Sequence, residues 1–236
     1  MSARALAVTG ALLVALVVPA SAEAVVEMAP LKPCYVGAET PSGPQTEGIT
    51  IRATGFTANS TVTITVDGQP VANGQAFQTD ANGALNLAPN AVPAPFPANG
   101  TREFPVQLTE VGNEANTATA TARTTPLGVT VKPRRAKPSQ RIRFNGSGFT
   151  GDAPVYAHYV YKNKHRKTVR MARRTGTCGA WSARKRQIPV RTPGPGRWIV
   201  QFDQSKRYRD ASRPDSGLES VFVRLFISVT LVRPGR

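Results

Sequence analysis

The chain has 236 residues and carries 30 Lys and Arg against 14 Asp and Glu, a net charge of +16. A structural zinc site takes about four ligands and only two His accompany the two Cys, so we expect no metal ion and no other cofactor. After the N-terminal segment, no stretch is both apolar enough and long enough to span a bilayer.

The first 22 residues have the pattern of a secretory signal peptide. Arg4 precedes an apolar run over residues 11–18, and an Ala-Ser-Ala triplet at 20–22 gives a cleavage site before Glu23. A membrane anchor is the alternative, but the run is shorter than the ~20 residues that a bilayer requires. We therefore expect a secreted, extracellular protein that can associate with the cell envelope.

Residues 23–125 are predicted to form a first, mildly acidic β-sandwich. Residues 62–66 (V-T-I-T-V) alternate in polarity and end at Asp67-Gly68, which is a hairpin signal. Residues 116–123 alternate Thr with Ala. Three prolines between residues 93 and 97 argue against a central strand there.

A hinge at residues 124–128 leads to a second sandwich, assigned to residues 126–236. Almost no segment has the pattern of a helix. Short runs of alternating apolar and polar residues, separated by turn residues, dominate instead. The strands predicted in this half cover residues 140–144, 155–162, 168–171, 180–183, 197–203 and 219–232.

The two halves repeat short motifs in the same order. I-R-A-T-G-F-T at 51–57 returns as I-R-F-N-G-S-G-F-T at 142–150, and the shared glycines, Gly55 and Gly148, lie 93 positions apart. Gly83 and Gly179 repeat at nearly the same offset. Collinear repeats of this kind predict two copies of one domain of about 95 residues.

The G-x-G-F-T element at 146–150, followed by an alternating strand, resembles a turn of bacterial immunoglobulin-like domains, including the IPT/TIG type. In that family the glycines permit a tight turn and the phenylalanine closes the end of the sandwich. Gly146, Gly148 and Phe149 match this pattern, whereas the first copy keeps only Gly55 and Phe56. More loosely, the chain is similar to two-domain secreted proteins of actinobacteria. The resemblance implies an all-β chain of two tandem immunoglobulin-like sandwiches after the signal peptide.

The positive charge lies almost entirely in the second half. Residues 1–126 hold five Lys and Arg against nine Asp and Glu, whereas residues 127–236 hold 25 against five. A shared fold does not require this difference, so we expect it to serve binding, because a strongly positive domain concentrates polyanions until salt screens it. Charge that only keeps the protein soluble is the alternative.

Immunoglobulin strand order predicts that three basic connections converge on the pole of the second sandwich that lies far from the first. The candidate polyanion-binding residues in these connections are Arg134, Arg135, Lys137, Lys162, Lys164, Arg166, Lys167, Arg184, Lys185, Arg186 and Arg191. This basic tip is expected to bind phosphate- or carboxylate-bearing polymers, and more weakly as salt rises. Nucleic acid is disfavoured as a partner, because alternation places Tyr159 and Tyr161 in the core instead of on a stacking surface.

The same strand order brings the two cysteines together. Cys34 is expected at the end of the first strand, at the pole that faces the second sandwich, and Cys178 in the turn before the fifth strand of the second sandwich. We predict a disulfide bond that clamps the two sandwiches, as exported chains often form. A free pair of thiols is the alternative.

The residues worth testing for catalysis are Asp152, His158, His165, Cys178 and Asp203. Cys178 lacks the motif of wall transpeptidases, and no hydrolase, metalloprotease or P-loop motif occurs. We expect His158 on a strand surface and His165 in a solvated loop, and therefore no enzyme.

These observations predict a noncatalytic exported binding or adhesion module of the cell envelope, with an anionic envelope polymer as its partner. The first alternative is a structural spacer, or a subunit of a surface assembly that contacts an acidic protein. A Cys-dependent wall enzyme is a third and weaker alternative.

Overall fold

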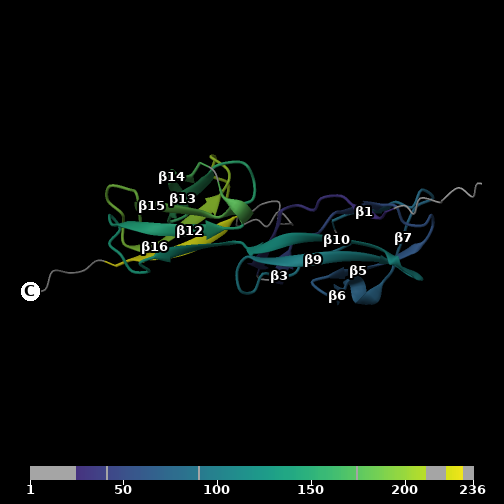
Figure 1. The fold of residues 1–236 in the computed structure, drawn as a ribbon. Helices are drawn as coiled ribbons and strands as arrows, with labels where there is room; N and C mark the ends of the chain where they lie inside the picture. Colours follow the sequence, from purple (N-terminus) through teal and green to yellow (C-terminus); the bar gives the residue numbers. More distant parts are fainter. Residues whose placement is uncertain (1–24, 41, 90, 174, 211–221, 231–236) are drawn as a thin grey trace, which may run out of the picture.

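The computed structural model describes residues 25–40, 42–89, 91–173, 175–210 and 222–230. The predicted signal peptide lies outside these ranges. The described chain is all-β, as predicted, and its helical segments are two short 3-10 turns, η1 (Val71–Gly74) and η2 (Thr177–Gly179). Two sandwiches lie end to end along the long axis of the molecule (Figure 1).

The first sandwich consists of a three-stranded sheet and a seven-stranded sheet. The smaller sheet has the order β1-β4-β8, with bounds β1 (Glu27–Met28), β4 (Ile51–Thr54) and β8 (Leu85–Leu87). The larger sheet has the order β3-β2-β10-β9-β5-β6, and β7 also pairs with β5. Its strands are β2 (Cys34–Thr40), β3 (Gly43–Thr46), β5 (Thr61–Val66), β6 (Gln69–Pro70), β7 (Phe77–Gln78), β9 (Arg102–Glu110) and β10 (Asn113–Pro126).

Alternating polarity explains why these segments form a sandwich. In β5, Val62, Ile64 and Val66 are buried while the threonines between them are half-buried. Phe104, Val106 and Leu108 alternate in the same way on β9. These two sets pack with Ile51 and Leu85 of the smaller sheet in one core cluster.

The second sandwich has a three-stranded and a four-stranded sheet. The smaller sheet has the order β11-β12-β15, with bounds β11 (Gly128–Lys132), β12 (Arg141–Ser147) and β15 (Trp181–Arg186). The larger sheet has the order β14-β13-β16-β17, with bounds β13 (Val155–Tyr161), β14 (Lys164–Ala172), β16 (Gly196–Asp203) and β17 (Val223–Val229).

The core of this half is more aromatic than that of the first. Ile142 and Phe144 of β12 and Trp181 of β15 pack against Tyr159, Trp198, Phe202 and their neighbours from the larger sheet. Tyr159 is fully buried, as its place in the alternation predicts. The strand order is immunoglobulin-like: in both sandwiches a three-stranded sheet faces a larger sheet, in which β5 pairs with β9 or β13 pairs with β16.

One element of the second sandwich differs from the predicted order. The sequence predicts a loop holding residues 162–167 between the third and fourth strands, but β14 pairs with β13 as a tight antiparallel hairpin. Lys162 and Asn163 form its turn with positive φ angles of 50° and 59°. The fourth strand therefore lies at the edge of the larger sheet, and it begins at Lys164 instead of residue 168.

Only Leu127 separates β10 from β11. Its backbone N–H donates to the carbonyl oxygen of Gly37 in β2 at 2.7 Å. On the other side, the Ser147 hydroxyl donates to the carbonyl oxygen of Pro126 at 2.7 Å. The junction is thus held by hydrogen bonds from both sandwiches.

Candidate functional site

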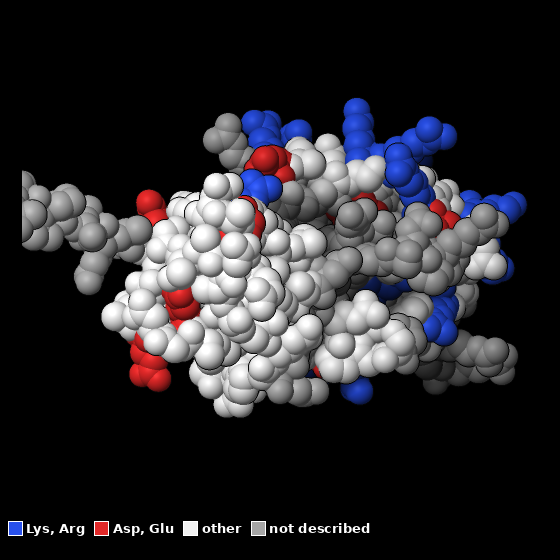
Figure 2. All heavy atoms as spheres, turned by 90° about the vertical axis from the view of Figure 1, so that its right-hand side faces the viewer, with Lys and Arg blue, Asp and Glu red and all other residues white. Residues whose placement is uncertain are grey.

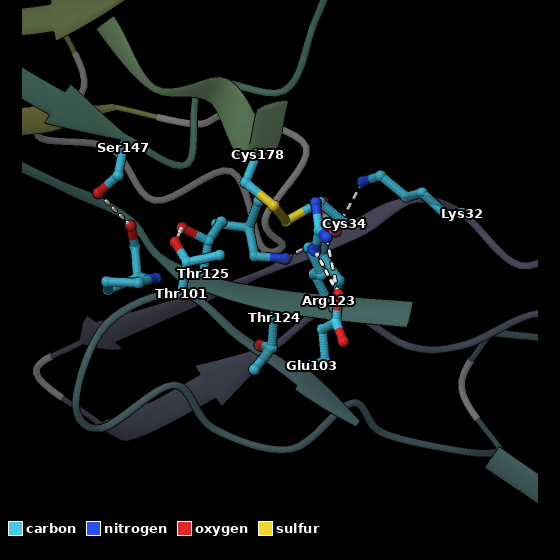
Figure 3. The surroundings of a disulfide bond; sticks show 12 residues. Lys32, Cys34, Thr101, Glu103, Arg123, Thr124, Thr125, Ser147 and Cys178 are labelled. Carbon is cyan, nitrogen blue, oxygen red and sulfur yellow. Dashed lines mark hydrogen bonds and ion pairs between the residues drawn. A yellow bond between two sulfur atoms is a disulfide. The ribbon is translucent and has the colours of Figure 1, made fainter. Parts of the chain in front are cut away.

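The predicted disulfide is present at the junction of the two sandwiches. Cys34 and Cys178 are bonded with Cα atoms 5.2 Å apart, and the described part of the chain has no free cysteine. Both half-cystines are buried. Figure 3 shows the bond reaching from η2 of the second sandwich to the strand that begins at Cys34 in the first.

The placement of Cys34 differs in detail from the prediction. It does not end the first strand but opens β2, which belongs to the opposite sheet and runs parallel to the end of β10. The reason is Pro30 and Pro33, because proline cannot donate to a ladder and so ends β1 early. Cys34 is paired with Arg123 in the register, only three positions before Pro126. This brings it close enough to η2 for the bond.

The repeated glycines shape the turn that carries Cys178. Gly179 has φ 69°, and a side chain there would lie 2.2 Å from the backbone nitrogen of Phe149. Gly148 has φ 81°, and its N–H donates to the carbonyl oxygen of Cys178 at 3.0 Å. Glycine is needed at both positions because larger residues tolerate neither the φ angle nor the close approach. The repeated glycines of the sequence motif therefore shape the turn that positions Cys178 for the disulfide bond.

Five of the eleven predicted polyanion-binding residues lie in connections at the far pole of the second sandwich. Arg134, Arg135 and Lys137 follow β11, Lys162 lies in the hairpin turn, and Arg191 follows β15. All five are exposed.

The other six residues lie on strands, which corrects the predicted loop placement. Lys164, Arg166 and Lys167 belong to the edge strand β14. Arg184, Lys185 and Arg186 belong to β15, where alternation turns Arg184 and Arg186 outward and leaves Lys185 half-buried on the side of Ile142. The positive charge is therefore spread over a sheet face and a sheet edge as well as the tip.

The sheet face carries cations that the sequence analysis did not select. In the register of the smaller sheet, Lys132 lies opposite Arg143, and Arg143 lies opposite Arg184. Arg141 lies opposite Arg186 two positions further along. We call these five exposed residues the cationic ladder: Lys132, Arg141, Arg143, Arg184 and Arg186. The alternation R-I-R-F at 141–144 indicated outward arginines, but the pairing with β15 follows only from the register.

The ladder has no acidic partner among the described residues. The acidic side chains described in the second sandwich are Asp152, Asp203 and Asp210. Asp203 contacts His158 and Asp210 contacts Arg224, both at the other sheet. Like charges directly opposite on a sheet are destabilising, with Cβ atoms only about 5 Å apart.

Figure 2 views the molecule from the end of the first sandwich. The surface facing the viewer is mostly uncharged with scattered acidic residues, and Lys and Arg side chains project mainly at the upper and right-hand margins of the molecule.

Three of the five residues considered for catalysis meet on the outer face of the larger sheet. His158 Nε2 lies 3.1 Å from Asp203 Oδ1 and 3.0 Å from the carbonyl oxygen of Ser205. Both are acceptors, so Nε2 carries the hydrogen. His158 Nδ1 lies 2.9 Å from the Thr168 hydroxyl oxygen, and His165 Nε2 lies 2.9 Å from the same oxygen.

This arrangement corrects the His158 prediction and part of the His165 prediction. His158 is fully buried instead of lying on the strand surface. His165 is exposed, as predicted, but lies on the strand β14 instead of in a loop, with its ring centre 5.0 Å from that of Tyr208. Burial raises the pKa of the Tyr208 phenol, and the charge of Asp210 adds to the effect. Both ring nitrogens of His158 have hydrogen-bond partners within the protein. The cluster therefore provides the hydrogen bonds that this buried side chain requires.

The described ranges contain neither a free thiol nor a metal-site geometry. Cys178 is bonded to Cys34 and is therefore not a nucleophile. No group of His, Cys, Asp and Glu with the geometry of a metal site occurs within the described residues. No described helix has the length and apolar character needed to cross a bilayer.

Comparisons with known proteins give distant structural likenesses and no family. No protein-family model matches the chain, and no curated protein matches it. Among solved structures, a tetra-tandem repeat from the extending region of a large adhesion protein is 12% identical, with a TM-score of 0.28. That match covers 87% of this chain, which spans only 50% of the repeat structure.

The chain is also similar to the E. coli chaperone DraB, at 13% identity and a TM-score of 0.27 over 76% of this chain and 92% of that one. Murine CEACAM1b is 8% identical with a TM-score of 0.22, over 87% and 100% of the two chains. Likenesses at this level carry no argument about function. The IPT/TIG and actinobacterial assignments stay predictions.

Proposed function

We propose that the protein is a noncatalytic, exported binding module that holds an anionic polymer of the cell envelope on its second sandwich. The cationic ladder is the observation that carries this proposal. Like-charged pairs such as Arg143 with Arg184 and Arg141 with Arg186 lower the stability of the sheet that contains them. Their cost is offset when a polyanion binds across them.

The geometry of the ladder suits a repeating anion. Neighbouring strands lie about 4.8 Å apart, and outward residues on one strand repeat every ~7 Å. The five cations therefore form a grid across which several phosphate or carboxylate groups of one chain can bind at the same time. Arg134, Arg135 and Lys137 extend the surface from the end of β11 around the far pole. Guanidinium groups also bind such anions through two parallel hydrogen bonds.

A pair of charge-matched variants tests the proposal. R143Q/R184Q removes two cations of the ladder, and K206Q/R207Q removes two exposed cations from the segment after β16. Binding of the oxidised chain to labelled polyphosphate and to isolated envelopes is measured at 0.1 M salt. We expect the first variant to bind polyphosphate at least about tenfold more weakly and the second to bind within about twofold of the wild type. Equal losses in both variants would mean that net charge alone, and no particular surface, determines binding.

A rigid spacer is the second candidate, and the junction favours it. The disulfide, the bond from Leu127 to Gly37 and the bond from Ser147 to Pro126 fix one sandwich on the other. A spacer would keep its place in the envelope after the ladder is neutralised, whereas the binding module would be lost from it.

A further inference from the structure

The larger sheet of the second sandwich carries an apolar row on the side that faces away from the core. Val160 on β13 lies opposite Ile199 on β16, and Ile199 lies opposite Phe226 on β17. Alternation puts all three on the side opposite Tyr159, Val200 and Leu225, which pack in the core. Phe226 is 56% exposed, and no other large apolar side chain described in this sandwich is comparably exposed. Val160 is buried and Ile199 is half-buried, so Phe226 is the exposed member of the row. Solvent-facing sheet positions are usually polar, so Phe226 requires an explanation.

A cavity of about 470 Å³ lies over this row. Its walls come from Tyr161, from the hairpin turn at Lys162 and Asn163, and from residues 195–197 at the start of β16. Cavities that hold small molecules have volumes in the range of about 300 to 1,000 Å³. The hollow is thus large enough for a ligand of moderate size.

Two cations border the apolar floor. The guanidinium of Arg197 lies 3.8 Å from the centre of the Phe226 ring, and Lys162 lies 5.5 Å from the centre of the Tyr161 ring. None of the ion pairs between described residues uses either of them. A guanidinium stacked on a ring keeps its N–H groups in its own plane, where they can still donate to a carboxylate.

We propose that this cavity binds an amphiphilic anion, an acyl chain that ends in a carboxylate. The chain would lie on Val160, Ile199 and Phe226, a row roughly 10 Å wide across three strands, and the carboxylate would meet Arg197 and Lys162. A polymer with anions along its whole length does not fit an apolar floor. The site lies on the other sheet from the cationic ladder and shares no residue with it, so this proposal does not rest on the polymer-binding one.

Dodecanoate below its micelle concentration is the probe, measured by calorimetry and by methyl chemical shifts of Val160 and Ile199. We expect saturable binding to the oxidised chain, with a loss of about tenfold or more in F226A and in R197Q. V111A is the matched control, because Val111 is 57% exposed but lies in the first sandwich. R143Q/R184Q is the second control, and both controls should bind dodecanoate like the wild type.

Three results would overturn the proposal. The first is equal binding of dodecyl trimethylammonium, which has the chain but the opposite charge. The second is dodecanoate binding that survives both F226A and R197Q, and the third is no binding at millimolar dodecanoate. If the wild type binds dodecanoate but not polyphosphate, only the proposed function is rejected; if it binds polyphosphate but not dodecanoate, only this site is rejected. Sedimentation that reveals a dimer abolished by F226A would assign the row to a second copy of the chain instead.

Discussion

Removal of the Cys34–Cys178 bond should lower stability far more than the loss of two buried sulfur atoms suggests. The bond joins residues 144 positions apart. In the chain-entropy treatment a crosslink of this span reduces the free energy of the native state relative to the unfolded chain by about 5 kcal/mol. Because the dependence on loop length is logarithmic, the value changes little if the sandwiches unfold separately.

Separate unfolding still leaves a closed loop. With the second sandwich native, the bond and Leu127 enclose roughly 90 residues of the first, which corresponds to about 4.5 kcal/mol. With the first native, they enclose roughly 50 residues of the second, or about 4 kcal/mol. A change of 4 kcal/mol in a domain of about 100 residues lowers Tm by about 15 to 30 °C.

The assay is calorimetry and urea denaturation of the C34S/C178S variant beside the oxidised wild type. Wild type reduced before the scan is the control, and it should unfold with the variant. A loss below about 1 kcal/mol in both would refute the reasoning, because the bond would then not restrict the unfolded chain. A large loss in the variant alone would instead point to strain from the serine side chains.

Two further predictions concern buried polar groups, one in each sandwich. Burial raises the pKa of the Glu110 carboxyl, but hydrogen bonds from Asn116 and Thr57 outweigh burial and bring this pKa below the ordinary 4.5. The stability that Glu110 contributes is therefore fully present above its unfolded-state pKa. That stability is lost as the pH falls through the folded-state pKa. Urea midpoints from pH 7 to 3 should fall less steeply in E110Q than in the wild type, while E103Q, at an exposed ion pair, should follow the wild type. The Tyr159 hydroxyl is buried without a hydrogen-bond partner among the described residues, and burial raises its pKa well above the ordinary value. Y159F should raise stability by about 1 kcal/mol in thermal unfolding, and a lower Tm would contradict this.

The fold class and the cysteine pairing could be predicted because each rests on local pattern. The alternation in 61–66 and 141–144 determines which side chains face the core. Given an immunoglobulin strand order, the position of Cys178 in a turn next to Gly179 places it at the junction. The sequence also shows the prolines near Cys34, but it does not show that the chain passes from the smaller to the larger sheet there.

Contacts between distant strands could not be predicted in the same way. The ladder depends on the register of β12 with β15, and no single strand encodes it. Likewise, His158 looked like a surface residue because alternation turns it away from the core. It is buried because the segment after β16, with Ser205 and Tyr208, folds back over it and His165 of β14 lies beside it.

The slope of log Kd for polyphosphate against log salt concentration tests the central claim most directly. The oxidised wild type and R143Q/R184Q are titrated from 0.05 to 0.3 M salt, beside K206Q/R207Q. If the ladder contacts the polymer, the slope of R143Q/R184Q should be smaller by roughly 1.5, because two fewer counterions are released, and K206Q/R207Q should keep the wild-type slope. An identical slope in all three proteins would contradict the account.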